Sequence, residues 1–243
     1  MTSKIHLPLN TIDTINQPPL YYLQVQDTFI LLTGFFWTIT YILYIRQAYR
    51  DESYGMPIIA LCANIGWEIV YGFRLPFTLT QVLVFVPWLI IDAFLVYTTM
   101  KFGPKQWNHA PMISQNLKAI LGGGVGMMVV LHWAFAETHG DDMDAMFWSA
   151  FVLQMFLGIS SVAQLMERGH TSGHSIEIWF CRFIGSASAI LTYCWRYFHY
   201  PKDYTVVGTP LTTFLFVAAE LADLYYPIVF KHLRKRNDKS KVL

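Results

Sequence analysis

Long apolar stretches fill most of this 243-residue chain, and only short polar connectors separate them. Crossing the hydrocarbon core of a bilayer takes roughly 20 mostly apolar residues in a helix. Because backbone groups in lipid must hydrogen-bond to one another, stretches of this length are predicted to be helical. Charged residues make up 14% of the chain, whereas a soluble domain carries about 25%. The sequence therefore predicts an all-α, polytopic membrane protein without a separate soluble domain.

Seven transmembrane helices can be drawn between the connectors, and we interpret residues 1–243 as a single membrane domain built on a seven-helix bundle. We expect a loose or surface-lying arm at 1–25, the bundle at 27–230 and a basic tail at 231–243. No small-residue cleavage site follows the first apolar stretch, so we expect it to be a retained helix. The predicted spans are 27–47, 55–73, 79–100, 117–137, 145–166, 173–197 and 206–230.

The lysines and arginines in the connectors, at the span ends and at the termini are distributed unevenly between the two sides of the predicted bundle. The side that holds the C-terminus carries twelve of them, and the other side carries four. Basic residues concentrate on the cytosolic side of a membrane, which predicts a cytosolic C-terminus and a lumenal N-terminus. We expect residence in the endoplasmic reticulum membrane. A net charge of only +1 argues against a nucleic-acid partner.

Ionisable side chains occur inside the predicted spans, at a cost of about 2.5–3.5 kcal/mol each. Helical spacing places Asn64, Glu68 and Tyr71 on one face of the second span. We expect these and the other ionisable groups to meet in one interior. The ionisable residues that lie well inside spans include Glu68, Asp92, Arg182, Glu220 and Asp223.

Two interpretations of these charges remain open. In one, Arg182 pairs with Asp92 or Glu220 and locks helices together. In the other, the site is catalytic, since one guanidinium cannot neutralise four carboxyls and at least one carboxyl stays protonated or solvated. A neutral carboxylic acid in an apolar cavity is a proton donor. We consider Glu68 and Asp223 the candidate catalytic acids.

Aromatic residues accompany the polar positions in the spans. Their faces attract cations when both partners are desolvated, although core packing explains such residues equally well. Tyr193 and Trp195, near a span end, fit interfacial anchors. The remaining candidates are Trp67, Tyr71, Trp88, Trp179, Phe183, Tyr225 and Tyr226.

No metal or cofactor is predicted. The chain has neither a histidine metal motif nor a phosphate-binding glycine loop. The aspartates of 141–144 lie in one short connector without a second cluster of ligands. We therefore expect chemistry that depends on side chains alone.

Six short motifs, in order between about residues 50 and 230, resemble the small integral-membrane terpene cyclases of fungal meroterpenoid and indole-diterpene pathways. They are YGMP at 54–57, NIGWEIVY at 64–71, WNHAP at 107–111, RGHTSG at 168–173, RFIGS at 182–186 and DLYY at 223–226. The resemblance implies a metal-independent cyclase, of lyase or isomerase type, that protonates the terminal epoxide of a prenylated substrate and directs a carbocation cyclisation.

The resemblance assigns the two catalytic acids to Glu68 and Asp223. We expect the substrate or its cations to contact further residues, namely Asn64, Trp67, Tyr71, Asp92, Trp179, Arg182, Glu220 and Tyr225. The resemblance also implies functional coupling to an upstream flavin epoxidase and to a prenyltransferase. The head group is left open between a polyketide-derived meroterpenoid, which we favour, and an indole diterpene. A proton-coupled transporter and a seven-helix receptor are the alternatives from other classes.

Overall fold

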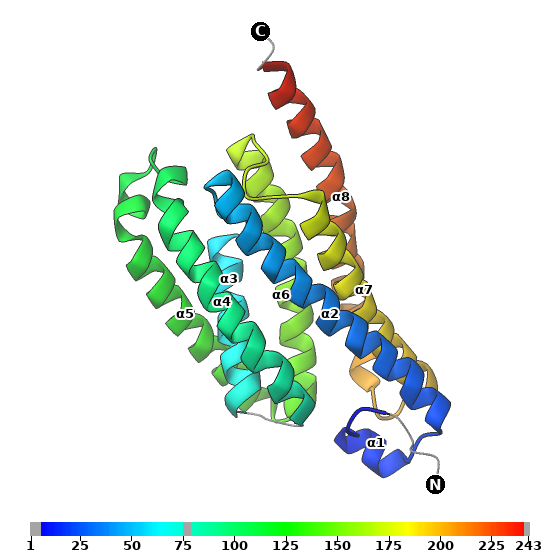
Figure 1. Ribbon diagram of the computed structural model, residues 1–243. Coiled ribbons are helices and arrows are strands. Elements are labelled where there is room, and N and C mark those ends of the chain that lie inside the picture. The colour runs from blue at the N-terminus through cyan, green and yellow to red at the C-terminus, as the bar shows by residue number, and fades with distance from the viewer. Residues whose placement is uncertain (1–5, 75–78, 241–243) are drawn as a thin grey trace.

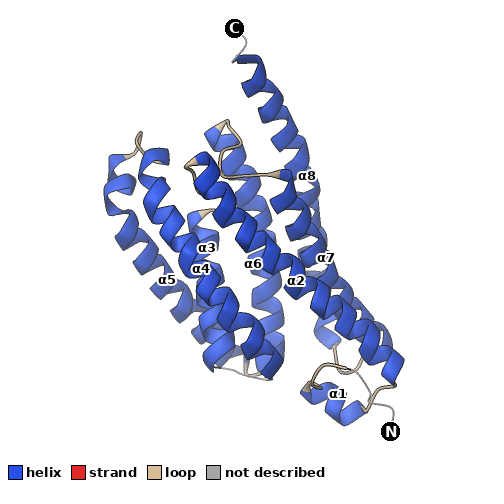
Figure 2. Cartoon of the chain, viewed as in Figure 1, coloured by secondary structure: helices blue, strands red, loops and turns tan. Residues whose placement is uncertain are grey.

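The computed structural model describes residues 6–74 and 79–240, and helices make up nearly all of this part of the chain (Figures 1 and 2). No strand occurs among these residues. The helices are α1 (Thr11–Asn16), α2 (Leu20–Asp51), α3 (Ile58–Ile69), α4 (Leu79–Gln106), α5 (Pro111–His139), α6 (Asp142–Arg168), α7 (Ile176–His199) and α8 (Pro210–Ser240). A π-helical turn at Val70–Arg74 continues α3, and a 3₁₀ turn at Thr205–Gly208 precedes α8. The all-α prediction is confirmed.

Among the residues that the structure describes, five helices are long and apolar enough to cross a membrane by length and composition. These segments are Leu20–Asp51, Val84–Gln106, Pro111–His139, Asp142–Arg168 and Pro210–Asn237. A shorter apolar helix covers Ile58–Phe73. Helix α7, which carries three charged side chains, is not among the five. The structure therefore supports a multi-pass membrane protein, whereas the predicted count of seven spans is not confirmed.

The long helices form a bundle in which α2 and α6 lie between an α3–α4–α5 group and an α7–α8 pair (Figure 1). The main packing partners are α2 with α7, α6 with α8, and α3 with α5. The largest described core cluster centres on α2, α3, α4 and the π-helical turn, including Tyr41, Tyr71 and Trp88, and also takes in side chains of α5, α6 and α7. The cavity described below lies between the α3–α4–α5 group and α7.

The N-terminal arm differs from the expectation of a loose segment. Asn10 caps α1, and its side chain accepts a hydrogen bond from the backbone N–H of Asp13. The Asp13 side chain is buried and accepts a hydrogen bond of 2.8 Å from Gln26 of α2. Helix α2 already begins at Leu20, directly after Pro19. Polar contacts therefore hold the arm against the bundle, and hydropathy alone did not reveal them.

Other helices also begin or end outside the spans that were predicted from the apolar stretches. Pro111 occupies the first turn of α5, and Asp141 caps α6 by accepting a hydrogen bond from the backbone N–H of Asp144. Both are ordinary helix-start signals. Helix α8 continues to Ser240, so most of the predicted basic tail at 231–243 is helical and continues the last helix of the bundle.

Two connectors pack tightly at the end of the bundle where α2 ends and α7 begins. Gly173 has a φ of +83°, and its backbone N–H donates to the Asp51 carboxylate at 2.8 Å. A Cβ atom on Gly173 would lie 2.5 Å from the Tyr54 carbonyl oxygen. Arg168 donates to that same carbonyl at 2.7 Å. The α2–α3 and α6–α7 connectors are thus locked together, which fixes the two groups of helices relative to each other.

Candidate active site

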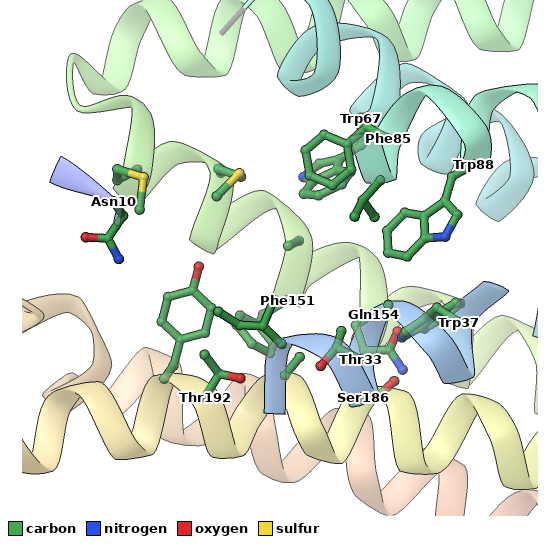
Figure 3. Close-up of a pocket in the computed structure, with 18 of the residues that line it drawn as sticks. Asn10, Thr33, Trp37, Trp67, Phe85, Trp88, Phe151, Gln154, Ser186 and Thr192 are labelled. Carbon is green, nitrogen blue, oxygen red and sulfur yellow. The ribbon is translucent and has the colours of Figure 1, made fainter. Parts of the chain in front are cut away.

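A cavity of about 310 Å³ lies inside the bundle (Figure 3). Side chains from α2, α3, α4, α6 and α7 line it, and residues of the N-terminal arm close one end. Its size falls within the range of small-molecule sites, at the lower end. The walls are mainly apolar, with a few polar groups at defined places.

The end of the cavity that α3 and α4 line is aromatic. Trp67 and Phe85 meet edge to face, with ring centroids 4.9 Å apart, and Tyr41 and Trp88 do so at 5.9 Å. The Trp67 indole N–H donates to the Ser149 hydroxyl at 3.1 Å, and that of Trp88 donates to Thr38 at 2.9 Å. These bonds satisfy the polar edges of both indoles. The arrangement suits an apolar chain, and it stabilises positive charge that develops beside the rings.

Two carboxyl groups meet beside this aromatic end. The Asn64 side-chain amide nitrogen donates to Glu68 Oε1 at 3.0 Å and to Asp92 Oδ2 at 2.8 Å. The Tyr41 hydroxyl lies 2.9 Å from that nitrogen and donates to Glu68 Oε1 at 3.3 Å. Glu68 and Asp92 are buried, at 1% and 0% exposure. Asn64 and Tyr41 line the cavity, so they connect the carboxyls with its interior.

The shared amide constrains the charge of the pair. Two carboxylates that approach the same nitrogen atom in a buried site repel each other, so this geometry favours a pair that carries a proton over a pair that carries two charges. Glu68 Oε2 and Asp92 Oδ1 have no hydrogen-bond partner among the residues that the structure describes. Helical spacing predicted that Asn64 and Glu68 share a face, but the approach of Asp92 depends on how α4 packs against α3.

A second buried cluster surrounds Arg182. Its guanidinium pairs with the Asp223 carboxylate through Nη2 and Oδ1, and Nε lies 3.4 Å from Oδ2. Nη1 donates to Ser161 at 2.9 Å and to Tyr44 at 3.3 Å. Arg182 and Asp223 are both 0% exposed. One of the two interpretations left open above paired Arg182 with Asp92 or Glu220, whereas its partner in the structure is Asp223. The carboxyls form two clusters, not one.

The other predicted binding residues lie at varying distances from the cavity. Trp67 and Asn64 line it directly. Tyr71 is buried against Trp67, with ring centroids 5.5 Å apart, and is not a lining residue. Trp179 donates its indole N–H to the Asp223 carbonyl at 2.6 Å, which places it beside the Arg182 cluster.

Two predicted binding residues on α8 lie away from the cavity. Tyr225 is 48% exposed on the outside of the bundle, so the prediction that it faces the interior is wrong. Neighbouring positions of a helix point in different directions, and Asp223 takes the inward one. Glu220 is half-buried one turn before Asp223 and does not line the cavity.

Several lining residues were missed by the sequence analysis. Gln154 of α6 and Ser186 of α7 are buried, and Figure 3 shows both on the wall of the cavity. Gln154 Nε2 and Ser186 Oγ have no hydrogen-bond partner within the described part of the chain. Arg196 lines the opposite end. A glutamine or an arginine inside an apolar stretch could have indicated a cavity-lining position from the sequence. Nothing in the sequence distinguished Trp37 and Phe85 in this way.

The aspartates at 141–144 have a structural explanation. Asp141 caps α6 through its bond of 2.9 Å from the backbone N–H of Asp144. Within residues 6–74 and 79–240, no group of three or more His, Cys, Asp or Glu side chains is placed to hold a metal ion.

Comparison with known proteins identifies the family. The sequence model of the Pyr4-like transmembrane terpene cyclases matches residues 12–236. The chain belongs to this family. It is 54% identical over 240 residues to the Pyr4-family terpene cyclase mfmH of Annulohypoxylon moriforme, covering 99% of each chain. No solved structure matches the chain with significance.

More distant relatives of this terpene cyclase extend over nearly the same length. The terpene cyclase macJ of Penicillium terrestre is 34% identical and covers 92% of this chain and 88% of its own. The terpene cyclase atmB of Aspergillus flavus is 35% identical, covering 90% of this chain and 92% of its own. The resemblance drawn from the six motifs is thereby confirmed, and the chain is a membrane terpene cyclase of a fungal family.

Proposed function

We propose that this terpene cyclase protonates the terminal epoxide of a prenylated substrate and directs the resulting carbocation through ring closure. The observation that supports this most directly is the pair of buried carboxyls, Glu68 and Asp92, on one amide nitrogen beside an aromatic cavity. A proton held by such a pair is available to a weakly basic oxygen. General acid catalysis of this kind contributes about 10²–10⁴-fold to rate.

In the proposed reaction the epoxide oxygen lies beside Tyr41 and Asn64, which line the cavity. With Glu68 protonated, the Tyr41 hydroxyl, 3.3 Å from Glu68 Oε1, accepts the carboxyl proton while it donates its own proton to the epoxide oxygen. The epoxide C–O bond at the more substituted carbon breaks, and the oxygen becomes a hydroxyl. The alkenes of the chain then attack the cation in turn, and loss of one proton from carbon ends the cascade. The product is an isomer of the substrate, so no metal, oxidant or reductant is required.

The aromatic walls and the folded shape of the cavity supply the remaining catalysis. Trp67, Phe85 and Trp88 lie on one wall, and Trp37 lies across from them (Figure 3). Their faces stabilise the migrating positive charge. Holding the flexible chain in a folded form before reaction lowers the entropic cost of ring closure.

Asp223 has a different role in this proposal. Because it is paired with Arg182, it acts as a carboxylate that positions α7 against α8 and supports the cavity wall at Ser186. Glu68 is the proton donor, with Asp92 as its partner. Glu68 and Asp223, the two acids that the family resemblance implied, therefore have separate functions in this proposal.

The proposed substrate carries a polyketide-derived head group, with an indole diterpene as the alternative. Its epoxide requires an upstream flavin-dependent epoxidase, and its chain requires a prenyltransferase. The enzyme would act in the endoplasmic reticulum membrane, with its N-terminus lumenal and its C-terminus cytosolic.

The test is an assay with microsomes that contain the protein and a synthetic terminal epoxide of a farnesylated phenol. We expect a cyclised isomer of the same mass, formed by the wild type and not by a Glu68→Gln variant present at equal amount. Microsomes with a Glu52→Gln variant serve as a matched control, because Glu52 forms an exposed pair with Lys105. Absence of a cyclised product from the wild type, with this and with an indole-linked epoxide, would reject the proposed chemistry.

A further inference from the structure

The end of the cavity remote from Glu68 has a distinct chemistry. Polar side chains from the N-terminal arm, α2 and α7 gather there, and Figure 3 shows Asn10 at this end, away from Trp88. Arg196 lies about 15 Å along α7 from Ser186, at 1.5 Å per residue. The polar lining residues of this end are Asn10, Thr11, Gln26, Asp27, Thr192, Tyr193 and Arg196.

Arg196 is a buried cation with no carboxylate in direct contact with its guanidinium among the described residues. It is 7% exposed, and its Nε donates to Gln26 Oε1 at 2.8 Å. Its guanidinium lies over the rings of Tyr193 and Tyr204, at 5.2 and 5.6 Å from their centroids. No carboxylate of the described residues lies within ion-pair distance of it.

Two carboxylates, those of Asp13 and Asp27, lie near this end, and neither contacts the Arg196 guanidinium directly. Asp13 accepts from Gln26 at 2.8 Å and so reaches Arg196 only through that amide. Asp27 accepts a hydrogen bond of 2.7 Å from the backbone N–H of Leu7. Arg182, also a buried arginine, has Asp223 directly on its guanidinium. A buried guanidinium without such a partner is costly unless a ligand supplies the missing oxygens.

We infer that Arg196, supported by Gln26, binds an anionic oxygen of the substrate's head group, a carboxylate or a phenolate. This inference rests on the proposed function and adds an orientation to it. A guanidinium offers five N–H donors in a planar fork that fits a carboxylate. The prenyl chain then runs along the apolar middle of the cavity, past Phe151 and Trp37, and places its epoxide at Tyr41. The N-terminal arm forms a wall of this head-group subsite.

The first experiment compares two epoxides in the cyclisation assay. One is the terminal epoxide of a farnesylated hydroxybenzoic acid, and the other is the terminal epoxide of farnesyl methyl ether, which lacks an acidic group. For Arg196→Gln we expect KM to rise about ten- to hundred-fold with the acid, from loss of a charge-assisted hydrogen bond. The ether should be cyclised with unchanged kcat and KM. Arg196→Lys, which keeps the charge, should recover part of the loss with the acid.

A purely structural role for Arg196 predicts a different pattern of turnover for the two substrates. If Arg196→Gln lowers turnover of the acid and the ether to the same extent, the residue supports the fold and the inference is wrong. Lys105→Gln is the control, because Lys105 lies 67% exposed in a surface pair. It should change neither substrate's kinetics.

A binding measurement keeps this inference separate from the proposed chemistry. The unreactive farnesylated hydroxybenzoic acid, without an epoxide, is titrated into purified protein in nanodiscs, with tryptophan fluorescence as the readout. We expect saturable binding to the wild type and about ten- to hundred-fold weaker binding to Arg196→Gln. The methyl ester with its phenol methylated should bind both proteins equally. If the acid binds both proteins equally, the head-group subsite is rejected even if cyclisation is observed. If binding depends on Arg196 but no epoxide is cyclised, only the proposed reaction fails.

Discussion

Arg182 of α7 and Asp223 of α8 form an ion pair that is completely shielded from the surroundings, with both residues at 0% exposure. Ser161 of α6 and Tyr44 of α2 also receive hydrogen bonds from the same guanidinium. Residues of α2, α6, α7 and α8 therefore meet at the Arg182 guanidinium. Removing a single partner from such a pair costs about 3–5 kcal/mol, because the other charge stays buried.

Asp223→Asn should therefore lower thermal stability markedly in detergent. Unfolding can be followed by the reaction of a thiol dye with Cys62 and Cys181, which are buried in the folded protein. The double variant Arg182→Met with Asp223→Leu, which removes both charges, should be more stable than Asp223→Asn alone. Glu220→Gln, one turn away and half-buried, should have a smaller effect on stability. An Asp223→Asn protein that unfolds at the wild-type temperature would show that the pair does not stabilise the bundle.

Glu68→Gln should reduce turnover by about 10²–10⁴-fold while the protein stays folded, because the amide cannot donate an equivalent proton. Asp92→Asn should also reduce turnover, since both carboxyls approach the same Asn64 nitrogen. Product is quantified by mass spectrometry, and folding is checked with the thiol-dye assay. Near-normal turnover by both amide variants would eliminate this pair as the proton source.

Gly173→Ala should destabilise the protein strongly. Its φ of +83° disfavours any side chain, and the new Cβ would lie 2.5 Å from the Tyr54 carbonyl oxygen. Gly122→Ala on α5 is the matched control, since a Cβ there meets nothing within 4 Å. Alanine is favoured over glycine in a helix by up to about 1 kcal/mol, so this control should be neutral or slightly stabilising. Equal unfolding temperatures for the two variants would contradict the close packing of the two connectors.

The orientation can be tested with reporters of membrane sidedness. A reporter after Leu243 and one at 169–173 should be cytosolic, whereas reporters at 141–144 and 200–203 should be lumenal. The pair at 169–173 and 200–203 tests whether α7 crosses the membrane despite its charges. We expect that it does, because Asp223 neutralises Arg182 inside the bundle. Both of these reporters on the same side would reduce the number of spans below seven.

Turnover should survive an excess of EDTA. The proposed reaction uses only the carboxyl proton and the aromatic walls, and Asp141 and Asp144 form the cap of α6. The assay is repeated with EDTA and then with added Mg²⁺. Activity lost with the chelator and restored by Mg²⁺ would require a metal ion in the mechanism.

The sequence by itself determined the features that depend on composition and on spacing along one helix. Long apolar stretches specified helices and a membrane environment, because unpaired backbone groups are excluded from lipid. The spacing of Asn64 and Glu68 placed both on one helix face, and their hydrogen bond of 3.0 Å follows from that spacing. The six motifs were sufficient to indicate the family.

Tertiary structure alone decided which residues from different helices meet. Periodicity shows that a charge faces inward, but it does not show which neighbouring helix supplies the partner. Asp92 therefore joined Glu68 only through the packing of α4 against α3, and Arg182 found Asp223 only through the packing of α7 against α8. The position of Arg196 at the far end of the cavity also depended on packing, because the N-terminal arm and α2 reach it from distant parts of the chain.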